Sequence, residues 1–314
     1  MSESTLFRPY RSEDATELLA LFNRVFGPLN PSLTPRSSDH WRWKFDENPH
    51  GNHSFVACSQ DDGHCLGFVG FIPQLMICGG QRRMSSQACD HMVDAACRSG
   101  LRKRGIFPGL MQRFIQTHCS PEGDVICWGF PTPEAFRIGQ QLLGYSVVRP
   151  VNMLLLTALP DPVPPTRSAR TQSLAALPAD TDELWGRLES EIDLAVVRNA
   201  TYLRWRYQQH PDVGYTFLEA RDVHDGSLRG LAIMRSGGLA EDVALIMEWL
   251  VPAEDQEATR ALFEACTQHA EVLGMTSLAA WFPESSVEFD RFQRLGFRVR
   301  FTKMVHTARS FDRS

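Results

Sequence analysis

Apolar residues recur at two different spacings along the first 150 residues, and these spacings predict both helices and strands. Between 11 and 26 the apolar positions Ala15, Leu18, Leu19 and Phe22 share one face of a helix. Short apolar runs bounded by polar or glycine-containing turns are typical of strands. The predicted strands cover 6–10, 54–58, 66–75, 83–93 and 125–130, and further helices cover 40–49, the stretch from 108 onwards and 133–143.

A proline-rich stretch divides the chain. Residues 157–172 contain Pro160, Pro162, Pro164 and Pro165 and have no periodic apolar pattern, which is typical of a linker. A length of 314 residues is sufficient for two domains, each with its own core. We therefore expect a first domain at 1–158, a linker at 159–172 and a second domain at 173–314.

The second half repeats the pattern of the first. Trp43 and Trp205 are 162 positions apart, and the same offset separates Phe45 from Tyr207, Pro49 from Pro211 and Phe55 from Phe217. Near the end, Trp281-Phe282-Pro283 and Leu295-Gly296-Phe297 match Gly129-Phe130-Pro131 and Leu143-Gly144-Tyr145 at an offset of about 152. These matches at nearly constant offsets predict a duplicated domain.

Composition and charge exclude several classes of protein. Hydrophobic residues make up 43% and charged residues 22% of the chain, and the net charge of −5 argues against a nucleic-acid partner. The eight cysteines contain no C-x-x-C pair, so we expect neither a metal site nor a disulfide framework. The first ten residues lack the basic and apolar regions of a signal peptide, and no apolar run approaches the ~18 residues that span a bilayer, so we expect a cytoplasmic protein without a membrane partner.

A basic loop stands between the predicted strand 83–93 and the next helix. Arg102, Lys103 and Arg104 precede Gly105, which allows an anion to approach the backbone without a Cβ in the way. The start of a helix adds unpaired amides and the positive end of its dipole. The stretch therefore predicts a phosphate-binding site.

The order of strand, R-x-x-G loop and helix resembles the acyl-CoA loop of the GNAT superfamily of N-acyltransferases, whose pattern is Q/R-x-x-G-x-G/A. Arg102 and Gly105 match this pattern, Ile106 follows them, and Phe107 stands where a small residue is usual. The lead-in from Val93 is about four residues longer than usual, which makes Arg98-Ser99-Gly100 a competing register. The opening R-P-x-R-x-E-D turn and the Leu143-Gly144-Tyr145 step also match the family.

The resemblance covers nearly the whole chain and implies two tandem GNAT-like domains. Each domain is expected to be of the α/β (α+β) class, with a mixed, mostly antiparallel sheet flanked by helices. The implied activity is transfer of an acyl group from acetyl-CoA or another acyl-CoA to a primary amine of a small molecule. By the resemblance, backbone groups near Met92 and Val93 bind the pantetheine arm, and the thioester lies between Val93 and Phe130. The implied CoA-binding residues are Met92, Val93, Arg102, Lys103, Arg104, Gly105, Ile106, Phe107 and Phe130.

Proton transfer would assist the reaction, and Asp90 and His91 are the candidate bases. Because adjacent residues of a strand face opposite sides, we expect one of the two to reach the acyl group. The family often has a tyrosine acid four residues before the L-G-F/Y glycine, but here that position is Gln140, which cannot act as an acid. Glu134 or Tyr145 could replace it, or the thiolate could leave unassisted.

The two copies differ at the loop. The second copy has Val251-Pro252-Ala253-Glu254 where the first has basic residues, so we expect a single CoA site, in the first copy. Phe107, the lengthened loop and Gln140 also fit an alternative, a GNAT-derived protein that binds CoA or another anion without turnover. The sequence specifies neither acyl length, acceptor nor oligomeric state.

Overall fold

A computed structural model of the chain describes residues 5–29, 35–98, 105–160 and 168–312. Contacts between residues divide the chain into two units. Unit 1 comprises Met1–Arg149, Leu194–Val197 and Met304–Ser314, and unit 2 comprises Pro150–Asp193 and Arg198–Lys303. Each unit is therefore built from segments that are not contiguous in the sequence.

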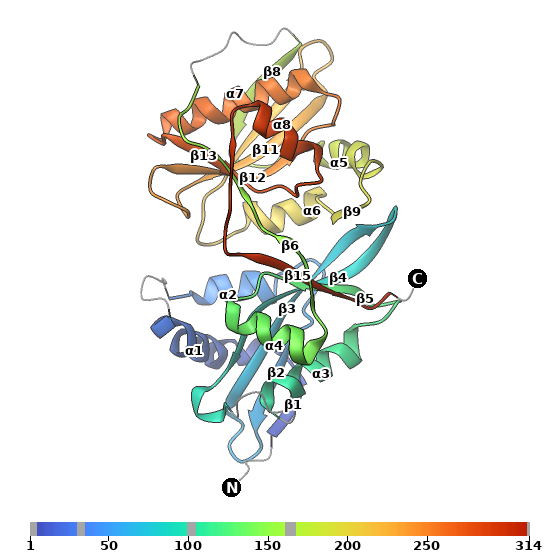
Figure 1. Ribbon diagram of the computed structural model, residues 1–314, viewed down its shortest axis with the longest axis vertical. Coiled ribbons are helices and arrows are strands. Elements are labelled where there is room, and N and C mark those ends of the chain that lie inside the picture. Colours follow the sequence, from blue (N-terminus) through green and yellow to red (C-terminus); the bar gives the residue numbers. More distant parts are fainter. Residues whose placement is uncertain (1–4, 30–34, 99–104, 161–167, 313–314) are drawn as a thin grey trace. The chain divides into compact units, whose positions relative to one another are not determined.

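Unit 1 has one mixed sheet in the order β1-β2-β3-β4-β5-β15-β6, with β9 paired to β3 (Figure 1). Its strands are β1 Thr5–Pro9, β2 Phe55–Ser59, β3 Cys65–Cys78, β4 Gln81–Val93, β5 Asp124–Gly129, β6 Ser146–Pro150, β9 Leu194–Val196 and β15 Val305–Ser310. Its helices are α1 Ala15–Phe26, α2 Ser38–Phe45, α3 Ile106–His118 and α4 Pro133–Leu143, and its 3-10 turns are Ser12–Asp14, Gly27–Leu29 and Ala95–Cys97.

Alternating side chains of the central strands build a core on each face of this sheet. Val56 and Cys58 of β2 pack in a cluster with α1 and α2, including the buried Trp41. Phe55 and Ala57, on the opposite face, pack in a cluster with α3. This alternation follows from the period of two along a strand, and it places helices on both faces of the sheet.

Unit 2 has a sheet in the order β14-β7-β13-β12-β11-β10-β8, with α7 lying across it (Figure 1). Its strands are β7 Met153–Leu156, β8 Ala169–Leu174, β10 Thr216–Asp222, β11 Leu228–Ser236, β12 Val243–Leu250, β13 Ser277–Ala280 and β14 Arg298–Arg300. Its helices are α5 Thr181–Glu189, α6 Ala200–Leu203, α7 Gln256–Val272 and α8 Val287–Arg294, and a π-helical turn spans Arg204–Gln208.

The two sheets have the same plan. In each, the fourth and fifth strands from one edge are a parallel pair, which is β4 with β5 in unit 1 and β12 with β13 in unit 2. The other described pairings are antiparallel. Gly144 and Gly296 both adopt positive φ, at 67° and 101°, after α4 and α8. These observations confirm the predicted class, two mixed and mostly antiparallel sheets flanked by helices.

Each sheet contains one strand that directly follows a strand of the other sheet in the sequence. β7 follows β6 of unit 1 in the sequence but lies between β14 and β13 of the second sheet. Conversely, β15 follows β14 of unit 2 and lies between β5 and β6 of the first sheet, where it is the red strand among blue and green ones in Figure 1. The end of the chain therefore completes the first sheet, whereas the linear division placed it in the domain 173–314.

The segment expected to be a linker ends in a strand. Residues 161–167 lie outside the described residues, but Ala169–Leu174 forms β8 and pairs with β10 from Phe217 to Asp222. β8 is an edge strand whose residues 170–173 are exposed. Because these exposed residues are polar, the sequence has no apolar alternation there from which a strand could be predicted.

Candidate functional site

A cleft opens in unit 1 where the parallel strands β4 and β5 separate. Their pairing ends at Gln87 and Trp128, whereas β4 continues to Val93 with β3 as its partner on one side. The cleft has a volume of about 1210 Å³. Its lining includes Phe22, Val25 and Phe26 of α1, Arg36, residues 88–93 of β4, Arg98, residues 105–108, residues 129–133, Phe136 of α4, Tyr145 and Thr307.

Asp90 lies at an irregular point of β4. The pairing of β3 with β4 shifts there, since Phe68 is opposite Met92 and Gly70 is opposite Cys89. Among the described residues, Asp90 is the only non-glycine with a positive φ, at 51°. Aspartate tolerates this left-handed conformation better than most residues, and backbone strain of this kind is concentrated at functional sites.

Two cations hold the Asp90 carboxylate. Its Oδ2 atom accepts a hydrogen bond from Lys44 Nζ at 2.7 Å and another from Arg36 Nη1. Burial alone would raise the pKa of Asp90, but the charges of Lys44 and Arg36 outweigh burial and hold the pKa well below its ordinary value. Because two cations already engage Oδ2, the geometry favours a positioning role for Asp90 over the predicted role in proton abstraction.

His91 is the better placed of the two predicted bases. Burial lowers the pKa of His91 to about 4, against the smaller opposing effects of Asp90 and a hydrogen bond to the Gly70 backbone. The ring is therefore neutral at pH 7. Its Nε2 is buried and has no hydrogen-bond partner among the described residues, which leaves the bond to Gly70 to Nδ1. Nε2 is then the nitrogen with the free lone pair, and so the atom that can accept a proton.

The predicted pantetheine-binding residues lie along the same strand. Met92 and Val93 both line the cleft, with the Met92 side chain buried in the cluster of α1 and α2. The carbonyl of Val93 accepts a hydrogen bond from Arg98 Nε at 3.1 Å. Phe130, at the end of β5, is 44% exposed and its ring is stacked 5.1 Å from that of His306. Met92, Val93 and Phe130 thus lie around one opening.

The predicted anion loop is described only at its end. Arg102, Lys103 and Arg104 lie outside the described residues, as does Gly100 of the competing register. Gly105 is the N-cap of α3 with φ −79°, and Ile106 and Phe107 begin the helix and line the cleft. The first amides of a helix lack intrahelical acceptors, so Ile106 and Phe107 direct theirs beyond the helix end. The described part of the longer lead-in contains the 3-10 turn Ala95–Cys97, which Asp94 caps by accepting from the Ala96 amide at 3.0 Å.

Tyr145 lines the cleft, whereas Gln140 does not. Gln140 is exposed and is absent from the cleft lining, and the Glu134 side chain lies outside the described part. The Tyr145 hydroxyl lies 2.7 Å from Cys127 Sγ, and burial, followed by the proximity of Cys127, raises its pKa well above the ordinary value. Tyr145 therefore stays protonated at pH 7.

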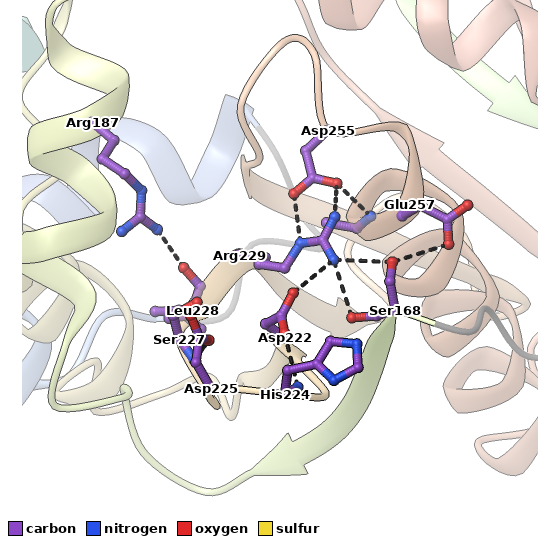
Figure 2. A network of polar contacts seen from close by, with 11 residues as sticks. Ser168, Arg187, Asp222, His224, Asp225, Ser227, Leu228, Arg229, Asp255 and Glu257 are labelled. Carbon is purple, nitrogen blue, oxygen red and sulfur yellow. Dashed lines mark hydrogen bonds and ion pairs between the residues drawn. The ribbon is translucent and has the colours of Figure 1, made fainter.

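The corresponding helix start in unit 2 is already occupied by a side chain of the protein. Asp255 caps α7 by accepting from the Ala258 amide at 2.9 Å and forms two hydrogen bonds with Arg229, at 2.6 and 2.8 Å. Figure 2 shows Arg229 between Asp255 and Asp222 and in contact with Ser168. A carboxylate therefore occupies the place where a phosphate would bind. Glu248, on β12, accepts from the Tyr207 hydroxyl at 2.7 Å.

Sequence reasoning missed Arg36 and Lys44. Both contact Asp90 although they are 54 and 46 residues away in the chain. Their one sequence signal is a cation just before the aromatic helix α2 and another in its last turn, which is also typical of solvated helix ends. Among the described residues, no group of three His, Cys, Asp or Glu side chains could hold a metal ion. No described helix is both long and apolar enough to cross a membrane.

No protein-family model matches the sequence, and no curated protein matches it. Solved structures do match the fold. A GCN5-related N-acetyltransferase from Anabaena variabilis aligns with 98% of this chain and 73% of its own at TM-score 0.71 and 12% identity. A tandem GNAT protein from the clavulanic acid biosynthesis pathway aligns with 99% of this chain and 100% of its own at TM-score 0.59 and 14% identity.

A further match is Saccharomyces cerevisiae N-myristoyltransferase with bound myristoyl-CoA, which covers 99% of this chain and 80% of its own at TM-score 0.61 and 13% identity. The chain therefore has the tandem GNAT fold, as the sequence resemblance implied. At these identities the likeness concerns the fold, and the chemistry has to be argued from the residues of the cleft.

Proposed function

We propose that this protein is an acyl-CoA-dependent N-acyltransferase whose reaction takes place in the cleft of unit 1. The observation that carries the proposal is the separation of β4 from β5, with a neutral histidine, His91, and a protonated tyrosine, Tyr145, both lining the opening. The tandem GNAT fold supports the same class of reaction.

The acyl donor is acetyl-CoA or another acyl-CoA. Its pyrophosphate would bind at the start of α3, where Gly105, Ile106 and Phe107 leave amides without intrahelical acceptors. Arg102, Lys103 and Arg104 add positive charge immediately before this helix in the sequence. The pantetheine arm would extend along β4 beside Val93 and bring the thioester into the opening near Phe130.

In the proposed reaction, the amine nitrogen of a small molecule attacks the thioester carbonyl. A bond forms between nitrogen and the acyl carbon, and the bond between that carbon and sulfur breaks. His91 Nε2 accepts the proton that the amine loses, and the Tyr145 hydroxyl supplies the proton that CoA thiolate gains. Proton exchange with solvent restores both side chains, so the net products are an amide and CoA thiol.

Asp90 is assigned a positioning role in this proposal. Its ion pairs with Lys44 and Arg36 fix the irregular turn of β4 that directly precedes His91. Since the ring of His91 must be oriented for its Nε2 to reach the amine, the position of this turn controls the geometry of the base.

A thiol-release assay tests the proposed activity. Acetyl-CoA, succinyl-CoA and longer acyl-CoAs are offered with a panel of primary amines, and amide formation is followed by mass spectrometry. Amine-dependent release of CoA with a matching amide product is the expected result. CoA binding without turnover on any pair would instead favour a non-catalytic CoA-binding protein.

Two observations favour that second function. Phe107 places a ring 5.7 Å from that of His91, where the family pattern has a small residue, and the usual tyrosine position is the exposed Gln140. A protein of this kind would bind CoA or another anion and release no thiol.

A further inference from the structure

A group of three charged side chains forms part of the wall of the cleft near α1 and β4. Arg36 and Lys44 both contact the same carboxylate oxygen, Oδ2 of Asp90. The side chains are largely shielded from solvent, with exposed fractions of 20% for Arg36, 13% for Lys44 and 9% for Asp90. Two cations thus share one anion.

The titratable neighbours of this group do not supply a second negative charge. Burial raises the pKa of the Cys89 thiol to about 12, and burial lowers the pKa of His91 to about 4, so both are neutral at pH 7. The described group of Arg36, Lys44 and Asp90 therefore carries a net charge of +1.

The nearby acidic residues of α2 and its C-terminal end have other partners. Asp39 and Glu47 accept from Arg42, at 2.8 and 3.1 Å. Asp46 accepts from Ser12 at 2.9 Å and from Tyr10 at 3.4 Å. Because a poorly solvated excess charge is unfavourable, the group of Arg36, Lys44 and Asp90 is suited to bind an anion.

The surroundings of Arg36 are apolar. Its guanidinium carbon lies 4.0 Å from the centre of the Phe22 ring, which holds the planar head against α1. Phe22, Val25 and Phe26 line the cleft on this side. A planar guanidinium binds a carboxylate with two parallel hydrogen bonds, and the neighbouring wall fits an apolar group.

We propose that Arg36 and Lys44 form a carboxylate subsite, so that one of the two substrates carries a carboxylate beside an apolar group. This proposal rests on the proposed acyltransferase function and names its substrate class. The carboxylate belongs either to the acceptor, which is then an apolar α-amino acid, or to a dicarboxylic acyl group on CoA. A bound carboxylate would add a second negative charge, so that the two cations and two anions together would be neutral.

The test compares matched substrates that differ by one carboxylate. L-phenylalanine and phenethylamine form the acceptor pair, and succinyl-CoA and butyryl-CoA form the donor pair. Arg36→Gln removes one cation and is expected to reduce kcat/KM for the carboxylate-bearing substrate by about 10- to 100-fold, the usual range for a lost charge-assisted hydrogen bond. The carboxylate-free member of the pair loses only the contribution of Arg36 to the position of the β4 turn, so its kcat/KM should fall by a smaller factor, and the ratio of the two losses measures the subsite.

Asp90→Asn gives the opposite prediction, because it frees both cations while keeping the shape of the side chain and tolerance of a positive φ. The carboxylate-bearing substrate should then bind more tightly, with a lower KM. Arg42→Gln is the control, since Arg42 is an exposed arginine of α2 paired to Asp39 and Glu47. Circular dichroism and CoA titration of each variant separate loss of the fold from loss of the subsite.

The two pairs identify the source of the carboxylate. A preference confined to phenylalanine assigns it to the acceptor, and one confined to succinyl-CoA assigns it to the acyl group. Equal effects of Arg36→Gln on both members of both pairs overturn the subsite. If no pair turns over, the acyltransferase proposal fails. Calorimetric titration then still decides the subsite, by comparing the binding of L-phenylalanine with that of phenethylamine and the binding of succinyl-CoA with that of butyryl-CoA. The absence of any carboxylate-dependent binding that Arg36→Gln weakens would then overturn it.

Discussion

The Asp255 carboxylate of unit 2 is bonded to Arg229, with Oδ1 2.6 Å from Nη2, while the same oxygen accepts the Ala258 amide at the start of α7. Burial acts to raise the pKa of Asp255, but the hydrogen bond from Arg229 and the other favourable contacts lower it below the ordinary value. This helix start therefore holds a permanent anion of the protein itself, and a phosphate would be repelled from it.

We therefore predict one CoA site per chain. Isothermal titration calorimetry with CoA should give a stoichiometry of one. Glu254→Ala, at an exposed position before α7, should change the affinity by about twofold or less, as expected for a surface substitution. Two equivalent sites would contradict the assignment of CoA binding to unit 1.

Gly105→Asp should weaken CoA binding by about 10- to 100-fold, because it places a carboxylate at the N-cap of α3, where phosphate is proposed to bind. The φ of −79° at Gly105 is accessible to any residue, so the fold should survive. Gly214→Asp is the matched control, since an added Cβ there meets no atom within 4 Å. If Gly100→Asp is damaging while Gly105→Asp is harmless, the competing register 98–100 holds the phosphate.

His91→Gln should lower kcat by about 10²- to 10⁴-fold, since glutamine cannot accept the amine proton, and Tyr145→Phe should lower it through loss of the acid. Because the pKa of His91 is lowered to about 4, the base is already deprotonated above that pH. The acid limb of kcat/KM that His91 produces should therefore lie near pH 4 rather than 6.5. Gln140→Ala, on the exposed side of α4, serves as the control and should leave the profile unchanged.

Local signals in the sequence predicted the elements that local chemistry determines. α4 spans Pro133–Leu143 as expected, because Thr132 caps its start, Pro133 occupies its first turn and Gly144 ends it with a positive φ. The cluster of Arg36, Lys44 and Asp90 could not be predicted in this way, since its members meet only through the fold. The placement of β15 beside β5 is likewise a long-range pairing, between residues such as Gly129 and Thr307.

Stability in acid should depend on His118, which stacks on His53 at 3.8 Å near the buried Asp124. Burial, and next the charge of His53, lowers the pKa of His118 to about 4 in the folded protein, whereas an unfolded histidine titrates near 6.5. Between these values the unfolded state binds the extra proton. The free energy of unfolding should therefore fall as the pH drops from 6.5 to 4.

His118→Phe keeps an aromatic ring against His53 and removes this titration. The urea midpoints of the variant and the natural protein should be similar at pH 7, and the variant should be the more stable of the two at pH 4.5. An identical loss of midpoint in both proteins between these pH values would exclude His118 as a source of the acid sensitivity.

The exchanged strand makes the first unit depend on the end of the chain. A chain that stops near Leu159 lacks β15, so β5 and β6 each lose their partner on that side and expose unpaired backbone groups. Such a truncated protein should aggregate or unfold at a lower temperature, and it should bind CoA poorly because Thr307 of β15 also lines the cleft. Fusing residues 304–314 to the truncated chain through a flexible linker should restore a cooperative thermal transition and CoA binding. A fusion of the same length with a scrambled 304–314 sequence is the control, and full stability of the unfused chain ending near Leu159 would show that the first sheet does not need β15.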